Sequence, residues 1–273
     1  IIQKVSEYWG QAVVADNRGG AGGSIASNVV AKAAPDGYTL LINSNAHSVN
    51  PSFYAKLPYD TAKDFIDIGL LAIQPNVLMV GNSTPFKTTQ DLIRQAKAKP
   101  NAINIAHAGV GSGTHLNSVK FKLVAGVEFT DVAYKGSGEA IIDVMGGRVD
   151  GYFSPISAGI GYIQSGKVRA LAVSTAKRSG QLPNVPTIAE SGVPGFDYSL
   201  WFGLWLPAKT PPAIVDKVVK DFTRALEDTA TREKLQSLGN ELNIMAPLAF
   251  HKFVQQEILD FAKIVKAAGI TPQ

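Results

Sequence analysis

The chain has 273 residues, a length that suits one large domain or two moderate ones and can bury a substantial core. Charged residues make up 18% of it, its net charge is +4 and no run of five like charges occurs, which excludes a disordered chain and a nucleic-acid-binding protein. It has no cysteine, which excludes disulfides, thiolate catalysis and cysteine-based zinc sites. No apolar stretch approaches the ~20 residues of a membrane span.

Short β-branched segments alternate with amphipathic segments along almost the whole chain. The predicted strands are residues 12–15, 38–42, 66–73, 77–80, 103–106, 128–133, 149–153 and 168–174. The predicted helices are residues 24–34, 88–99, 113–125, 137–145, 155–164, 211–227, 229–238 and 247–268, with a polar loop at 43–50. Ser24 and Thr88 are placed as helix caps. Because strands and helices alternate, we expect an α/β protein with parallel sheets covered by helices on both faces.

Two segments rich in proline and glycine, residues 80–87 and 182–206, interrupt this alternation. They are either crossovers between two lobes or long loops within one domain, and the pattern alone leaves both open. The second segment holds Trp201, Phe202 and Trp205, an aromatic stripe that favours core packing.

The sequence lacks the motifs of several enzyme classes. We find no zinc-protease helix, nucleophile elbow, P-loop or dinucleotide-binding glycine pattern. The four histidines, His47, His107, His115 and His251, never stand four residues apart, so a metal site made of histidines is not expected.

Two glycine-rich loops lie between a predicted strand and a predicted helix, where backbone N–H groups can meet an anion. For residues 17–23, a flexible surface turn is the favoured interpretation. For residues 108–115, which include the hydroxyl groups of Ser112 and Thr114, a binding role is favoured over simple helix capping, because ligands of open α/β sheets bind beyond the carboxyl ends of strands.

Other polar residues at strand ends are weaker candidates. Lys135, Gly136 and Ser137 repeat the pattern of a strand end, a glycine and a helix cap, although a surface lysine is usually only solvated. Residues 43–47 form a polar segment that turn chemistry alone explains. Asp150 begins a predicted strand after Arg148, and a structural pair or a cap is its favoured role.

Several motifs share their order and spacing with a known family. They are residues 33–40, Asn50 with Pro51, residues 111–116, residues 134–137, residues 147–150, residues 185–190 with Gly195 and Phe196, and Pro207 with Ala208 leading to Pro211. In this order they resemble the extracytoplasmic solute receptors of tripartite tricarboxylate transporters, the Bug-type family. The resemblance extends from about residue 3 to residue 273.

The resemblance implies a two-lobed, type II periplasmic-binding-protein-like α/β fold, each lobe a mostly parallel sheet flanked by helices. Residues 1–80 with 202–273 would form the first lobe and residues 81–201 the second. Such receptors catalyse no reaction and need no cofactor. They capture a small mono- or dicarboxylate in the cleft and deliver it to a membrane permease. The resemblance thus implies a periplasmic monomer whose signal peptide has been removed.

The family places ligand contacts on loops of both lobes. On this chain the corresponding residues are Ser44, Asn45, His47, Gly111, Ser112, Gly113, Thr114, His115, Lys135, Gly136, Ser137 and Asp150. The family also begins with an apolar strand and a loop rich in proline and glycine, which this chain does not show before its first helix. We therefore expect about twenty further residues before Ile1 in the functional protein.

Two alternatives to a receptor stay open. The first is an α/β enzyme acting on a small anionic substrate, with Lys135, His115 or Asp150 as acid or base, which the missing nucleophile motifs disfavour. The second is a ligand-sensing regulatory module, which the lack of a DNA-binding segment disfavours.

Overall fold

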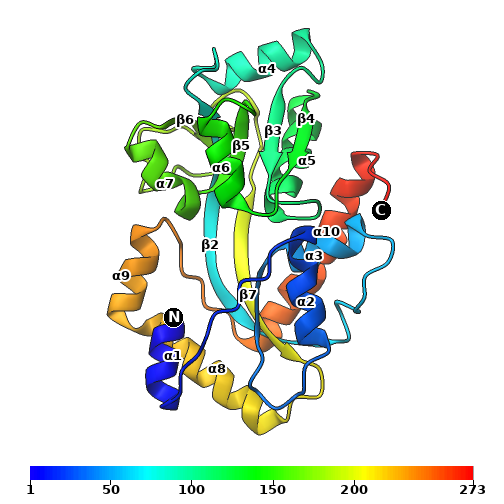
Figure 1. Ribbon diagram of the computed structural model, residues 1–273, viewed down its shortest axis with the longest axis vertical. Coiled ribbons are helices and arrows are strands. Elements are labelled where there is room, and N and C mark those ends of the chain that lie inside the picture. The colour runs from blue at the N-terminus through cyan, green and yellow to red at the C-terminus, as the bar shows by residue number, and fades with distance from the viewer. Residues whose placement is uncertain (273) are drawn as a thin grey trace.

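The computed structural model describes residues 1–272 of the chain. Figure 1 shows two lobes, one above the other, with long strands passing between them. Strand β2 (Phe65–Gly81) continues from the lower lobe into the upper one, and β7 (Ser199–Pro207) pairs with its lower part. We call the lower lobe the first lobe and the upper one the second.

The sheet of the first lobe has the strand order β1–β7–β2, in which β1 spans Leu41–Ser44. Strand β7 is antiparallel to both neighbours, so that Leu41 lies opposite Trp205 and Phe65 opposite Pro207. The helices of this lobe are α1 (Ile2–Trp9), α2 (Ser24–Ala31), α3 (Ala46–Phe53), α8 (Pro212–Glu227), α9 (Thr229–Ser237) and α10 (Pro247–Ala267), with a short 3-10 turn, η1 (Ala21–Gly23), before α2.

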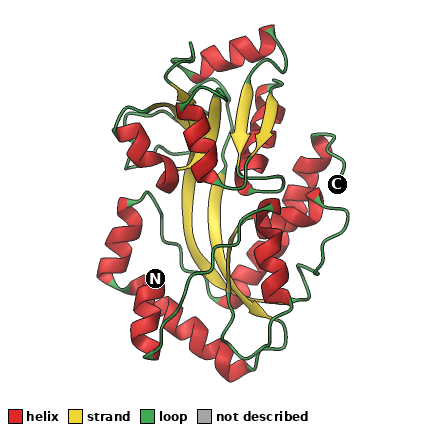
Figure 2. Cartoon of the chain, in the orientation of Figure 1, coloured by secondary structure: helices red, strands yellow, loops and turns green. Residues whose placement is uncertain are grey.

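In the second lobe, the upper end of β2 pairs with β5 (Gly151–Pro155) and β6 (Val168–Val173), both antiparallel to it. Beyond β5 lie β3 (Asn104–His107) and then β4 (Thr130–Ala133), which run parallel to β5. The helices are α4 (Thr89–Ala98), α5 (Gly113–Ala125), α6 (Ser137–Met145) and α7 (Ile156–Gln164), and Figure 2 shows them surrounding the strands.

The two-lobed α/β fold is as predicted, but the strand directions are more mixed than expected. Among residues 1–272, the parallel ladders between strands are those of β3 with β4 and β3 with β5, and one isolated parallel bridge joins Val173 to Thr187. Strands β2 and β7 cross between the lobes in opposite directions, so the ladder that they share is antiparallel, and β2 also runs against β5 and β6 in the second lobe.

Helix α10 packs against the cores of both lobes. Its Phe250 belongs to the aromatic core of the first lobe with Trp201 and Trp205, which confirms core packing of the aromatic stripe. Near its C-terminal end, Phe261 and Val265 are buried in the core that contains most of the second lobe's large apolar side chains. One continuous helix therefore ties the two lobes together.

Helices whose ends carry strong local signals have the bounds or caps that the sequence predicts. Both α5 and α6 have the predicted bounds. Thr88 caps α4 as predicted: its hydroxyl accepts the N–H of Asp91 at 3.1 Å, and the Asp91 carboxylate accepts the N–H of Thr88 at 3.0 Å. This reciprocal pair satisfies two donors that a helix N-terminus leaves free.

Elsewhere the local patterns were misleading. The predicted strand at 12–15 has no regular secondary structure, and the predicted polar loop at 43–50 contains most of α3. The two predicted strands at 66–73 and 77–80 form the single strand β2. Strand β7 was not predicted, and the N-cap of α2 is Gly23 rather than Ser24.

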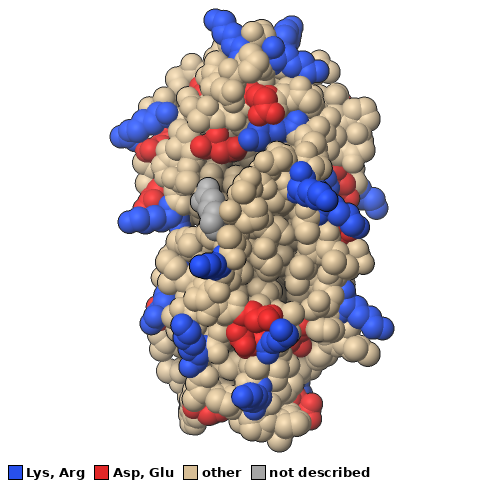
Figure 3. Space-filling view, turned by 90° about the vertical axis from the view of Figure 1, so that its right-hand side faces the viewer, with Lys and Arg blue, Asp and Glu red and all other residues tan. Residues whose placement is uncertain are grey.

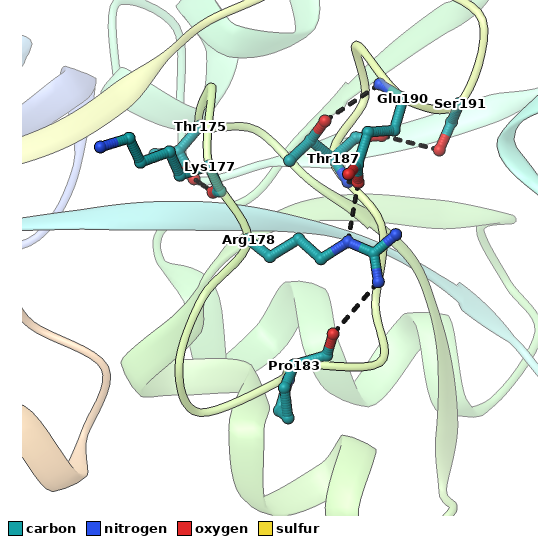
Figure 4. A network of polar contacts seen from close by, with 7 residues as sticks. All are labelled: Thr175, Lys177, Arg178, Pro183, Thr187, Glu190 and Ser191. Carbon is teal, nitrogen blue, oxygen red and sulfur yellow. Dashed lines mark hydrogen bonds and ion pairs between the residues drawn. The ribbon is translucent and has the colours of Figure 1, made fainter.

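The long segment between β6 and β7 is ordered by a polar network, which Figure 4 shows from close by. The Glu190 carboxylate accepts hydrogen bonds from the Arg178 guanidinium and from the N–H of Thr187, each at 2.8 Å. The Thr187 hydroxyl in turn accepts the N–H of Glu190 at 3.0 Å. These contacts explain how a segment without helix or strand keeps one conformation next to the sheet.

The surface agrees with the modest net charge. On the face drawn in Figure 3, lysine and arginine side chains are scattered rather than gathered into one basic patch. Among residues 1–272, no helix combines the length and the apolar character that crossing a bilayer requires.

Candidate functional site

The loop between β3 and α5, residues 108–112, is held by its own side chains. The Ser112 hydroxyl accepts the N–H of His115 at 3.2 Å and so caps α5, while Thr114 Oγ1 accepts the N–H of Ala108 at 2.9 Å. The two hydroxyls also lie 3.0 Å apart within hydrogen-bond distance of each other. Both predicted hydroxyls are therefore used to shape the loop, and both residues are buried.

The same loop leaves backbone donors free. Within the described part of the chain, the N–H groups of Gly109, Val110, Gly113 and Thr114 have no hydrogen-bond acceptor. The last two open α5 and have no partner within the helix, where the helix dipole also favours negative charge. Such an array of donors can bind a carboxylate.

A second loop, between β4 and α6, repeats this arrangement in part. Helix α6 begins at Ser137 after Gly136, without a side chain capping its first turn. The Ser137 hydroxyl instead lies 2.8 Å from the Tyr152 hydroxyl, and burial raises the pKa of Tyr152 to about 12. Lys135 is exposed, and its N–H donates to the Glu139 carboxylate at 3.2 Å.

The third loop, residues 17–23, comes from the first lobe and packs backbone to backbone against the other two. A Cβ atom on Gly22 would lie 2.5 Å from the carbonyl oxygen of Val110, and one on Gly19 would lie 3.1 Å from that of Lys135. Gly22 also has φ of 57°, which favours glycine. The close approach argues against a free surface turn and brings the three loops together.

Helix α3 supports these loops through side chains that sequence reasoning had missed. Asn50 Nδ2 donates to the carbonyl of Gly22 at 3.2 Å, and the Tyr54 hydroxyl donates to the carbonyl of Val110 at 2.8 Å. The predicted residue Asn45 precedes α3 and is fully buried, and its Nδ2 donates to the Tyr198 hydroxyl at 2.7 Å. The sequence signal that could have indicated these supporting side chains was the pair of Asn50 and Pro51 among the family motifs.

Three further predicted residues lie near these supports. Gly111 has φ of 73°, and Gly113 is buried so closely against Asn45 that no Cβ would fit. His115 faces inward: its Nδ1 accepts the N–H of Gly111 at 3.3 Å. Burial lowers the pKa of His115 to about 3, which keeps this nitrogen free to accept.

His47 does not lie among these loops. Its ring is fully buried and packs against Phe65 and Trp205, with centroid distances of 4.7 and 4.4 Å. Burial lowers its pKa to about 3. We therefore leave His47 out of the site, because a neutral ring inside an aromatic cluster has no surface to offer a ligand.

Asp150 and Ser44 have structural partners instead. The Asp150 carboxylate accepts the N–H of Asn104 at 2.7 Å, at the start of β3, whereas the loop of Ser112 follows the end of that strand. Asp150 therefore lies at the opposite end of the strands, in the structural role that its sequence position favoured, and not among the ligand contacts that the resemblance implied. The Ser44 hydroxyl accepts the N–H of Ala46 at 3.3 Å and supports the start of α3.

Charged groups are sparse around the meeting point of the three loops. Arg18 is exposed but paired with Asp16 at 2.8 Å, whereas Lys135 is exposed and has no ion pair within residues 1–272. Among residues 1–272, no group of three or more histidine or acidic side chains is arranged to hold a metal ion. The groups available to a ligand here are therefore mainly backbone N–H groups, which can bind an anion.

Solved structures of similar proteins match this fold over nearly the whole chain. Rpa4515 of R. palustris, solved with adipate, is 36% identical with a TM-score of 0.95, covering 100% of this chain and 91% of its own. The periplasmic binding protein BugD is 34% identical with a TM-score of 0.95, covering 100% and 92%. MatC from Rhodopseudomonas palustris, solved with bound malate, is 31% identical with a TM-score of 0.91, covering 97% and 91%.

The model of one protein family, described as "Tripartite tricarboxylate transporter family receptor", matches residues 1–270. The family and these solved structures are solute-binding receptors, so the prediction that the chain is no enzyme is confirmed over the enzyme alternative. Because the match spans nearly every residue, the chain belongs to the tripartite tricarboxylate transporter receptor family.

Proposed function

We propose that the protein is a receptor that captures a small mono- or dicarboxylate where the three loops meet. The observation that carries this proposal is the set of unpaired N–H groups of Gly109, Val110, Gly113 and Thr114. A carboxylate accepts such hydrogen bonds strongly, because its charge assists each of them. The first turn of α5 adds the favourable end of the helix dipole.

The similar structures support a carboxylate ligand. Rpa4515 was solved with adipate and MatC with malate, and both molecules are dicarboxylates. Both proteins exceed 30% identity over almost all of this chain. We propose that one carboxylate group of the ligand meets the first turn of α5 and that Lys135, Gly136 and Ser137 line the entrance beside it.

We further propose how the chain divides and where it works. Strand β2 changes its partner from β7 to β5 between Pro75 and Asn76, so we place one lobe crossing there and the other just before Ser199. Membership of a transporter receptor family supports delivery of the ligand to a membrane permease, and BugD supports a periplasmic location. We propose that the receptor acts as a monomer.

Thermal unfolding tests the proposal, because a ligand that binds only the folded state raises the melting temperature. Adipate and malate are the first probes, followed by monocarboxylates, with adipamide as a neutral analogue of adipate. At 100 times its dissociation constant, a ligand adds about 2.7 kcal/mol to the free energy of unfolding. We expect at least one acid to raise the melting temperature and adipamide not to; a folded protein that responds to none of the acids would refute a carboxylate receptor.

A further inference from the structure

One peptide group of the loop is held from both sides. The Val110 carbonyl accepts the Tyr54 hydroxyl at 2.8 Å, and the N–H of Gly111, in the same peptide, donates to His115 Nδ1 at 3.3 Å. In a planar trans peptide these two groups point in opposite directions. Tyr54 follows α3 of the first lobe, and His115 lies in the first turn of α5 in the second.

We infer that Tyr54 and His115 are positioning residues for ligand capture, which clamp the Val110–Gly111 peptide so that the free N–H groups of the loop keep their aim. The affinity part of this inference rests on the proposed function. The clamp itself is a property of the protein without ligand.

The loop needs such a clamp because of its glycines. Gly109 has φ of 107° and Gly111 has φ of 73°, and a glycine can change such angles at little cost. A flip of the Val110–Gly111 peptide would turn the Val110 oxygen to the side where the Gly111 N–H now lies. It would also break both hydrogen bonds that hold this peptide. Without these bonds the backbone angles on either side can change, and so can the direction of the Val110 N–H, which has no partner of its own.

His115 is suited to accept the hydrogen bond from Gly111 rather than to contact a ligand. Its ring lies between Phe53 at 4.8 Å and His107 at 4.1 Å, measured between ring centroids, and the residue is buried. A neutral ring with Nδ1 as acceptor carries its proton on Nε2. Tyr54 reaches the same peptide from the first lobe, so the loop conformation depends on contact between the lobes.

Three variants separate the clamp from simple packing. Tyr54→Phe removes the donor and keeps the ring. His115→Leu removes the acceptor, while His115→Asn retains an acceptor at a position similar to Nδ1 and serves as the conservative rescue. Tyr38→Phe, at an exposed tyrosine, is the matched control.

The first readout is hydrogen exchange of the Gly111 amide without ligand, resolved by NMR. We expect faster exchange of this amide in His115→Leu, and the rate of the parent protein in His115→Asn and Tyr38→Phe. The clamp would be overturned if the Gly111 amide exchanged in His115→Leu at the rate of the parent protein. It would also be overturned if this amide exchanged as fast in His115→Asn as in His115→Leu. This readout needs no ligand, so it stands even if the proposed function fails.

The second readout is the affinity for the acid that gives the largest thermal shift among adipate, malate and the monocarboxylates, by calorimetry. Tyr54→Phe and His115→Leu should each weaken binding about 3- to 10-fold, the net value of one hydrogen bond. The double variant should lose less affinity than the product of the two single fold-changes, because both residues act on one peptide. Unchanged affinity in both single variants would refute positioning.

Discussion

The Tyr198 hydroxyl donates a hydrogen bond of 2.6 Å to the carbonyl oxygen of Gly113, the first residue of α5. The same hydroxyl accepts Nδ2 of Asn45, which precedes α3. A single buried hydroxyl, on the residue directly before β7, therefore bonds to the starts of helices in both lobes. The Tyr198 backbone adds to this junction, since its carbonyl accepts the Ser174 hydroxyl at 2.7 Å.

Tyr198→Phe should lower the free energy of unfolding by about 1–3 kcal/mol, because it leaves the buried Nδ2 of Asn45 without an acceptor. Urea unfolding measures this, with an unchanged dependence on urea as the sign that the folded state is intact. Tyr38→Phe, on the surface, is the control. Equal urea midpoints for the two variants would show that the Tyr198 hydroxyl contributes nothing to stability.

Ser112 should act chiefly as a helix cap. Ser112→Ala removes the acceptor of the His115 N–H and should cost about 1 kcal/mol, whereas Ser112→Gly should cost only a few tenths. Denaturant titration distinguishes the two. If alanine is tolerated as well as glycine, the hydroxyl does not stabilise α5 and its role lies with the ligand.

Gly111→Ala should be more harmful than Gly126→Ala, although both glycines have positive φ. The left-handed conformation costs each alanine about 1–2 kcal/mol. At Gly126 a Cβ meets nothing within 4 Å, but at Gly111 it would lie 2.6 Å from Asn50 Oδ1. We expect a larger loss of stability at Gly111, accompanied by weaker ligand binding only there. Similar losses at both positions would mean that Asn50 moves aside freely.

The long-range attraction of anions should depend on Lys135. Lys135→Met should slow association with a carboxylate and reduce the dependence of that rate on salt, because a charge near the entrance steers ligands. Lys97→Met, at an exposed lysine of α4, is the matched control. Stopped-flow kinetics at low and high ionic strength give the comparison, and identical salt dependence in both variants would return Lys135 to a solvated surface role.

The sequence predicts this fold well where the signals are local. Helix α5 starts at a serine cap and is followed by Gly126 with positive φ, so its bounds follow from its own residues. Helix α3 gives no such signal, because it is polar, contains Pro51 and is buried on most sides. Without an exposed face it has no amphipathic period, and packing between the lobes decides its conformation.

In the candidate site, too, the parts with local sequence signals were predictable and the parts that depend on long-range contacts were not. The glycine loop at 108–115, with the hydroxyls of Ser112 and Thr114, is recognisable as strand-end chemistry. The loop at 17–23 is not, because no strand precedes it and only the fold brings it to the site.

The position of Asp150 was predictable, because it lies at the start of the predicted strand at 149–153, whereas ligands of parallel sheets bind beyond the carboxyl ends of strands. The parallel pairing of β5 with β3 confirms that position. The supporting role of Tyr54 was not predictable, because it depends on a contact between residues distant in sequence.

Acid should destabilise the protein well above the range in which carboxylates titrate. Burial lowers the pKa of His47 and His115 to about 3, and that of His107 below its ordinary value of 6.5. Around the last two, Asp131 favours the charged form and Lys122 opposes it, but burial dominates.

Below pH 6.5 the unfolded chain therefore binds protons that the native protein does not. The contribution of the neutral rings is complete above that pH and is lost as the pH falls toward the lowered values. Well below pH 6.5, His47 and His115 should each remove up to about 1.4 kcal/mol per pH unit, and His107 should add to this loss. Urea unfolding between pH 7 and pH 4 measures the slope, and His47→Phe should reduce it by the share of one histidine. A stability that stays constant from pH 7 to pH 5 would contradict the assignment of these rings as buried and neutral.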